Sequence, residues 1–148
     1  MSRTVMQDDT LLAGSIAENI AFFDARIDMD KVREAAGAAA IHDEIDAMPM
    51  EYGTLVGDMG VQVSGGQRQR ILIARALYRE PGLILFDEGT ANLDAESERR
   101  IAEVLTSLAP TRIIVAHRSH LLSLADIVYE VRDGQVSRVH PFVLPASI

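Results

Sequence analysis

Hydrophobic and polar residues follow patterns along this chain that change near residue 64. Up to that point, helix start and stop signals predict short helices separated by loops. Beyond it, apolar residues recur at helical spacing and gather in two short runs, Leu83–Phe86 and Ile113–Ala116, which are typical of buried strands. The order helix, strand, helix, strand predicts an α/β fold with a parallel sheet in the second half, after a helical first part.

The first part contains a clear helix start. Ser15 is followed three residues later by Glu18, which is the pattern of a capping box, so a short helix is expected to begin there. Three further elements are expected: a helix that starts at Asp28 or Asp30 and carries Lys31 to Ala40, a helix between Ile41 and Ala47, and a structured loop without regular elements over residues 51–63.

The second part is predicted to contain two longer helices. Gln67–Tyr78 is expected to be a helix with Arg68 and Gln69 outside its buried face, and Ala95–Leu108 is a second amphipathic pattern. The apolar runs that follow these helices are typical of strands in a sheet that is covered on both faces. Near the end, Asp133-Gly134 between two short apolar segments predicts a β-hairpin.

Composition narrows the range of functions. The chain has 148 residues, no cysteine, and a net charge of −8 from 14 basic and 22 acidic residues. The lack of cysteine excludes disulfides, thiolate zinc sites and cysteine nucleophiles, and it fits a reducing cytoplasmic setting. The acidic balance disfavours DNA or RNA binding, which relies on basic residues that neutralise phosphates. No apolar run approaches the roughly 20 residues that cross a bilayer.

A glycine-containing segment at the start of a predicted helix is the strongest candidate for a phosphate site. Its sequence is Val63-Ser64-Gly65-Gly66-Gln67. Adjacent glycines let backbone N–H groups approach a phosphate, and a helix N-terminus presents unpaired donors and the positive end of the helix dipole. The Ser64 hydroxyl adds a donor. Taken alone, so short a motif is more often a plain glycine turn that caps a helix.

Two acids follow the first apolar run. In a parallel sheet, ligands bind at the carboxyl ends of strands, and Asp87 and Glu88 emerge at such an end. Asp87 is placed to hold Mg²⁺ through its water shell, and Glu88 to orient or deprotonate a water that attacks a γ-phosphate. Taken alone, a strand that ends in solvated carboxylates is an equally good interpretation.

Two further polar residues are candidates for the same site as these acids. His117 follows the second apolar run, so it is expected at the same sheet edge, where a contact to the γ-phosphate or the catalytic water is favoured over a purely structural role. Gln7 lies in a predicted loop beside Asp8 and Asp9, and by itself it is an ordinary surface glutamine.

Together these residues resemble the ATP-binding cassette (ABC) family of transporter ATPases, over nearly the whole chain. The resemblance matches Ser64, Gly65, Gly66 and Gln67 to the signature motif (with Val63 for the usual leucine), Asp87 to the Walker B aspartate, Glu88 to the catalytic glutamate, Asp94 to the D-loop, His117 to the switch histidine and Gln7 to the Q-loop glutamine. It implies that Glu88 and His117 are catalytic, that Gln7, the signature residues and Asp94 bind ATP, and that Asp87 and Gln7 hold Mg²⁺.

The resemblance also implies a fold and partners. The fold is a partial P-loop-NTPase-like parallel sheet, the ABC ATPase core, with an N-terminal helical subdomain and a C-terminal β-hairpin. Residues 1–148 would form one incomplete ABC ATPase domain. Its first part, residues 1–80, would carry the Q-loop, the helical subdomain and the signature helix. Its second part, residues 81–148, would be the α/β part with the Walker B motif, the D-loop and the H-loop. Implied partners are a second nucleotide-binding domain, paired head to tail, and the transmembrane domain of an exporter at the cytoplasmic face of the membrane.

Finer features indicate an exporter. His117-Arg118 is similar to exporter-type domains in general. The run Val5–Ile16 is similar to exporters that cleave double-glycine leaders and secrete bacteriocins or colicin-like peptides. The P-loop pattern G-x-x-x-x-G-K-S/T is absent from the sequence, and the only lysine, Lys31, has no glycine-rich loop around it. The chain is therefore expected to be a fragment or truncated product that binds MgATP weakly or not at all and does not turn it over alone.

Three hypotheses remain at this stage. The first is the nucleotide-binding domain of a peptide, bacteriocin or toxin exporter, present as a fragment. The second is a truncated, non-catalytic module that binds a partner cassette through its signature motif. The third is a DNA-repair or chromosome-maintenance ATPase, which the absence of sustained heptads and cysteines and the acidic charge disfavour.

Overall fold

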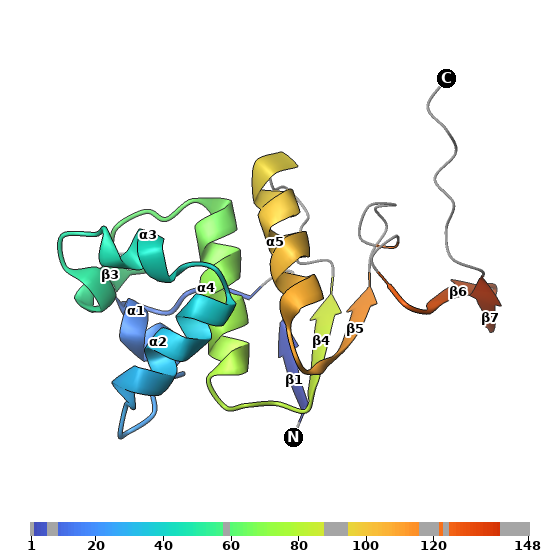
Figure 1. The fold of residues 1–148 in the computed structure, drawn as a ribbon, viewed down its shortest axis with the longest axis horizontal. Coiled ribbons are helices and arrows are strands. Elements are labelled where there is room, and N and C mark those ends of the chain that lie inside the picture. The colour runs from blue at the N-terminus through green and yellow to red at the C-terminus, as the bar shows by residue number, and fades with distance from the viewer. Residues whose placement is uncertain are drawn as a thin grey trace. The chain divides into compact units, whose positions relative to one another are not determined.

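A computed structural model describes residues 2–5, 9–57, 60–87, 95–115, 122 and 125–139 of the chain (Figure 1). The predicted site residues Gln7, Glu88, Asp94 and His117 lie outside these ranges. The chain divides into two compact units, Met1–Ile114 and Val115–Ile148, which are described separately. In the described part of the chain, no helix combines the length and the apolar character needed to cross a membrane.

A three-stranded sheet forms one side of the first unit. Its strands, in spatial order, are β1 (Ser2–Val5), β4 (Leu83–Asp87) and β5 (Thr111–Val115). β1 and β4 run parallel, with Ser2 opposite Leu83 and Val5 opposite Phe86. Helix α5 (Ala95–Ser107) lies between β4 and β5 in sequence, as the predicted α/β order requires (Figure 1). The predicted parallel sheet is therefore confirmed, and this parallel pair includes β1, a strand that neither apolar run forms.

The helical part lies on the other side of α4 (Figure 1). Its elements are β2 (Gly14–Ser15), α1 (Ile16–Ile20), α2 (Met29–Ala38), α3 (His42–Asp46), the 3₁₀ helix η1 (Glu51–Gly53) and β3 (Leu55–Val56). β2 and β3 pair antiparallel. This short pair was not expected, because residues 51–63 were predicted to hold no regular element.

The predicted helix caps are present. The Ser15 hydroxyl accepts a hydrogen bond from the Glu18 amide at 3.2 Å, and Glu18 accepts from the Ser15 amide at 2.7 Å. The hydrogen bonds that the Glu18 carboxylate accepts from the Ser15 amide and from the Ser15 hydroxyl lower the pKa of Glu18 from its ordinary value. The Asp28 carboxylate caps α2 by accepting from the amides of Asp30 and Lys31. The helix ends at Ala38 rather than Ala40, where the backbone turns left-handed with φ of 51°.

Helix α4 (Gly65–Leu77) is the centre of the first unit. It contacts α1, α2, α5 and β1. Because neighbours surround it, Gln69 is only 6% exposed and Arg70 only 3% exposed. The expectation that Gln69 lies outside the buried face is therefore wrong, whereas Arg68 is exposed as expected.

The sheet is less covered than its apolar runs suggest. Ile84 and Phe86 of β4 are buried, and the alternate residues Leu83 and Leu85 are only half-buried. In β5, Ile113 is 50% exposed and Val115 44% exposed. Coverage on both faces, which an unbroken apolar run favours, therefore does not extend to β5 among the residues that the structure describes.

The second unit contains the predicted hairpin. β6 (Val128–Arg132) and β7 (Gln135–Val139) pair antiparallel, with Arg132 opposite Gln135. Between them, Asp133 and Gly134 have φ of 50° and 75°. Two consecutive positive φ angles are typical of a type I′ turn, whose twist matches that of the flanking strands, and Asp-Gly adopts it readily.

A buried polar cluster ties the segment after residue 9 to α1 and α4. The Asn19 side chain, which is fully buried, accepts from the Leu12 amide at 2.9 Å and donates to the carbonyls of Leu12 and Ser15 at 2.9 and 3.0 Å. Arg75 of α4 donates to the Asn19 side chain at 2.7 Å, to its carbonyl at 2.9 Å and to the Thr10 carbonyl at 3.2 Å. We call this set the Asn19–Arg75 cluster.

Arg75 is the cation of this cluster. Burial lowers the pKa of Arg75 from its ordinary value, and the negative charge of Asp9 opposes that shift. The guanidinium nevertheless stays protonated, because its ordinary pKa lies far above any physiological pH. It therefore needs hydrogen-bond acceptors on the surrounding chain, and Asn19 and Thr10 provide them.

Replacing Asn19 tests the cluster. We expect Asn19→Leu to lower the free energy of unfolding by about 2–4 kcal/mol, because it removes the acceptor of the Leu12 amide and one acceptor of the partly buried Arg75. Urea denaturation followed by circular dichroism measures the change. The control is Gln62→Leu at an exposed amide side chain, which we expect to stay within about 0.5 kcal/mol. Equal effects of the two changes would contradict the assigned role.

Candidate functional site

The described part of the predicted site is the N-terminal turn of α4 together with the end of β4. It contains Ser64, Gly65, Gly66, Gln67 and Asp87. The proposed roles of Gln7, Glu88, Asp94 and His117 fall outside the described residues, so their convergence on one spot stays a prediction.

A capping box forms the start of α4. The Ser64 hydroxyl accepts from the Gln67 amide at 3.1 Å, and the Gln67 side-chain oxygen accepts from the Ser64 amide at 2.9 Å. The chain thus enters the helix in an extended conformation, with φ of −62° and ψ of 160° at Ser64. The sequence analysis considered this segment as a phosphate site or as a plain helix cap, and the structure shows that it is at least a cap.

The capping box leaves donors available at this turn. Ser64 and Gly65 are exposed, and the first amides of a helix have no partner within the helix. The hydroxyl of Ser64 uses its oxygen as an acceptor, which leaves its proton to be donated elsewhere. Exposed N–H groups, a hydroxyl and the positive end of a 13-residue helix have the chemistry that an anionic group such as phosphate requires.

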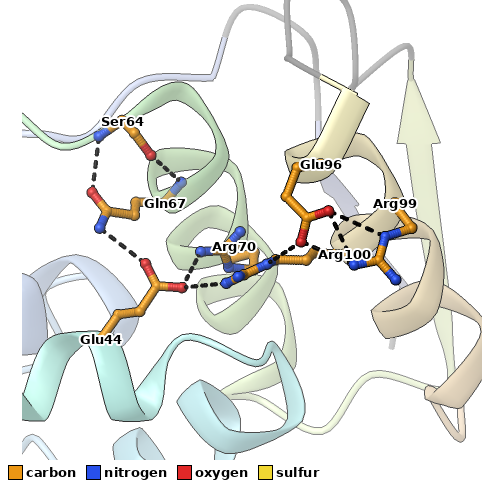
Figure 2. A network of polar contacts seen from close by, with 7 residues as sticks. All are labelled: Glu44, Ser64, Gln67, Arg70, Glu96, Arg99 and Arg100. Carbon is orange, nitrogen blue, oxygen red and sulfur yellow. Dashed lines mark hydrogen bonds and ion pairs between the residues drawn. The ribbon is translucent and has the colours of Figure 1, made fainter.

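One carboxylate supports this turn from the neighbouring helix α3. Glu44 accepts a hydrogen bond from the Gln67 side-chain amide at 2.9 Å and is ion-paired with Arg70, a second residue of α4 (Figure 2). It also accepts from Arg100 of α5 at 3.2 Å. The sequence analysis did not find Glu44, and no local pattern marks it, because its partners lie 23, 26 and 56 residues further along the chain.

A second set of ion pairs continues along α5. Glu96 is bonded to Arg100 at 3.1 Å and to Arg99 at 3.0 Å (Figure 2). Arg99 also pairs with Glu103 at 3.1 Å. The hydrogen bonds from Arg100 and then Arg99 lower the pKa of Glu96. All of these side chains are largely exposed, so the pairs are expected to add little stability.

Helices α4 and α5 approach each other closely at Gly66. A Cβ atom built on Gly66 would collide with the Oγ of Ser97 in α5 and lie 2.7 Å from its Cβ. A residue larger than glycine at position 66 therefore requires Ser97, or the helix that carries it, to shift. The sequence analysis explained this glycine by the approach of a phosphate, and the structure adds helix–helix packing as a second reason.

Asp87 ends β4 and is exposed. Its position at the carboxyl end of a strand in a parallel sheet is the place where ligands bind in such folds. Within the described ranges, no group of three or more histidine, cysteine or acidic residues is arranged to hold a metal ion directly. Of the two predicted Mg²⁺ ligands, Asp87 and Gln7, the structure therefore describes only Asp87.

A cavity of about 520 Å³ lies elsewhere in the first unit. It is lined by residues of α2, the C-terminal end of α4 and the segment before β5, among them Lys31, Tyr78, Pro81 and Pro110. Of the predicted site residues that the structure describes, none lines this cavity. It therefore contributes nothing to the candidate site.

Comparison with known proteins identifies the class of protein. Residues 2–91 match the family described as ABC transporter. Because this match covers more than half of the chain, the chain belongs to the ABC transporter family. Binding of ATP is a property of that family, and the family resemblance predicted from the motifs is confirmed.

Several relatives are similar over most of the chain. The probable microcin-H47 secretion/processing ATP-binding protein and the colicin V secretion/processing ATP-binding protein, both of Escherichia coli, are each 48% identical over 131 residues, which is 88% of this chain and 19% of theirs. ABC transporter B family member 17 of Arabidopsis thaliana is 45% identical over 134 residues, 89% of this chain and 11% of that protein. The chain thus spans about a fifth or less of these relatives.

A solved structure confirms the fold. The chain is similar to a bacterial Atm1-family ABC exporter with ATP bound, with a TM-score of 0.79 and 35% sequence identity over 92% of this chain and 24% of the other. The predicted fold class, a partial ABC ATPase core with an N-terminal helical part and a C-terminal hairpin, is therefore correct.

Substitutions at positions 66 and 97 test the helix–helix contact. We expect Gly66→Ala to lower the free energy of unfolding by about 1–3 kcal/mol, because the new methyl group overlaps Ser97. Adding Ser97→Gly removes the obstructing Cβ. The free energy of unfolding of the double variant should therefore fall by about 1–2 kcal/mol less than the sum of the decreases in the two single variants. Thermal and urea denaturation of the four proteins give this coupling free energy.

Gly37 of α2 is the matched control. A Cβ at Gly37 meets nothing within 4 Å, and the residue is exposed in a regular helix. We expect Gly37→Ala to stabilise the chain by about 0.4–1 kcal/mol, because alanine restricts the unfolded chain without strain in the helix. If Gly66→Ala also stabilised the chain, the contact with Ser97 would not limit position 66.

Proposed function

We propose that this chain is the signature-bearing part of the nucleotide-binding domain of an ABC exporter. In the complete transporter, this domain would couple ATP binding and hydrolysis to the export of a peptide, bacteriocin or toxin. The observation that carries the proposal is the exposed, capped N-terminal turn of α4 at Ser64 and Gly65, in a chain 48% identical to two secretion/processing ATP-binding proteins. The cargo class rests on those two relatives and on the resemblance of the run Val5–Ile16 to exporters of bacteriocins or colicin-like peptides.

The signature residues of this chain would meet a nucleotide that is held by the P-loop of a partner. The Ser64 hydroxyl and the first amides of α4 would donate to a phosphate oxygen, and Gln67 would hold Ser64 in place through the capping box. Asp87 would hold Mg²⁺ through coordinated water. Mg²⁺, when bound, neutralises charge on the phosphates. Gln7, Glu88, Asp94 and His117 keep the roles that the family resemblance implies for them.

The partners are proposed on the same basis. A second nucleotide-binding domain would supply the P-loop that faces Ser64, in a head-to-tail pair. A transmembrane domain would place both at the cytoplasmic face of the membrane. Because the chain spans only 19% of the two Escherichia coli relatives, the activity, cargo and partners of a whole transporter are proposals for this chain.

The first hypothesis is favoured over the non-catalytic module. Both use the signature surface, but no observation on the described residues favours a module that binds without contributing to turnover. The DNA-related class is also without support, since the similar proteins named above are transporters and secretion proteins.

The purified chain alone is expected not to hydrolyse ATP. The P-loop normally supplies the backbone cradle and the lysine that contact the phosphates, and the printed sequence has no such motif. A phosphate-release assay with MgATP should give no turnover above background. Turnover that disappears in Glu88→Gln would contradict this expectation, because it would show a complete site within the chain.

A mixed assay tests the function itself. The probe is the ATP-binding region of the colicin V relative, with its P-loop intact and its own signature serine changed to alanine. We expect the chain to raise the turnover of this probe, since only the chain supplies an intact signature, and we expect Ser64→Ala to remove most of the gain. An unchanged rate without association contradicts the proposal. ATP-dependent association without turnover supports the non-catalytic module instead.

A further inference from the structure

Three donors from two helices converge on the carboxylate of Glu44 in α3. Gln67 and Arg70 come from the first two turns of α4, and Arg100 comes from α5 (Figure 2). Gln67 and Arg70 are three residues apart, so they lie on the same face of α4. Glu44 therefore holds one face of the helix start and joins it to α5.

Glu44 is the counter-charge of a buried cation. The Arg70 side chain is only 3% exposed, and its Nε has no hydrogen-bond partner within the described part of the chain. Glu44 itself is 30% exposed, so its attraction to Arg70 is only partly screened by water. Removal of the carboxylate would leave a guanidinium buried without compensation, which is strongly unfavourable.

Glu44 also sets the orientation of the Gln67 amide. The oxygen of that amide accepts from the Ser64 backbone, and its nitrogen donates to Glu44. The carboxylate can only accept, so it selects the amide orientation in which the oxygen points toward Ser64. The orientation of the Gln67 amide thus depends on a side chain 23 positions earlier in the sequence.

We propose that Glu44 is a positioning residue for the nucleotide-binding turn of α4. Its carboxylate orients Gln67, and through Gln67 the backbone and hydroxyl of Ser64, and it fixes this turn to Arg100 of α5. The proposal rests on the function proposed above, in which Ser64 meets the phosphate of a nucleotide held by a second cassette. Glu44 does not touch the nucleotide and acts only through these partners.

Glu96 offers a matched comparison. It is also a glutamate bonded to Arg100, at 3.1 Å, but its other described partner is Arg99 on the same helix. Glu44→Gln and Glu96→Gln each remove one negative charge next to Arg100. They differ in that only Glu44 is bonded to α4.

The test is ATP-dependent association of the chain with the P-loop-bearing probe described above, measured by titration calorimetry at a temperature where every variant is folded. We expect Glu44→Gln to raise the dissociation constant about tenfold with full stoichiometry, since a charge-assisted contact is lost. Glu96→Gln should stay within about twofold. Amide hydrogen exchange at residues 64–67 should accelerate in Glu44→Gln only.

The dissociation constant and the stoichiometry together distinguish a positioning role of Glu44 from a mere loss of folding stability in the variant. A chain that is merely destabilised would show a smaller binding-competent fraction with an unchanged dissociation constant, and that result would overturn the inference. Equal effects of Glu44→Gln and Glu96→Gln would overturn it as well. If neither the wild-type chain nor Ser64→Ala associated with the probe, the result would contradict the proposed function itself. The role of Glu44 alone would be refuted if the wild-type chain bound normally, Ser64→Ala lost binding and Glu44→Gln had no effect.

Discussion

The N-terminal turn of α4 is held between two neighbouring helices, and the candidate site depends on that support. On one side, the missing side chain of Gly66 lets α5 approach until Ser97 leaves no room for a Cβ. On the other side, Glu44 of α3 bonds to Gln67 and Arg70. A helix start that is fixed in this way presents its amides and the Ser64 hydroxyl in one direction. Such fixed dipoles bind an anion without first having to reorganise.

The same helix connects the turn to the rest of the first unit. Its C-terminal half carries Arg75, which holds the chain around Thr10 and Asn19. The two ends of α4 therefore anchor different parts of the chain: the segment that follows the predicted Q-loop at one end, and the predicted phosphate-binding turn at the other. A displacement of α4 along its axis would move both, because a buried helix behaves as a rigid element.

Local patterns predicted much of this arrangement. Two capping boxes, at Ser15 and Ser64, and the Asp133-Gly134 turn involve only residues within three positions of each other. Short stretches of sequence are therefore enough to predict them. The parallel sheet followed from the order of elements, and the family from the spacing of motifs. Helix ends were off by a few residues, as at Ala38, because termination depends on one backbone angle at Ala40.

The remainder depends on contacts between distant residues. No local pattern marks Glu44 or Asn19, because the arginines that bond to them lie 26 to 56 positions further along the chain. Gln69 appeared to face solvent because helical periodicity describes one buried face, whereas α4 has neighbours nearly all round. The β2–β3 pair joins residues about 40 positions apart, which no short pattern reveals.

The close approach of α4 and α5 also constrains how this region can change over evolutionary time. The space at position 66 is defined by the side chain at position 97, so neither position is free to change size independently. In a collection of related sequences, a residue larger than glycine at the first position should therefore occur together with a smaller one at the second. The two sites would then be inherited as a pair, although 31 positions separate them along the chain.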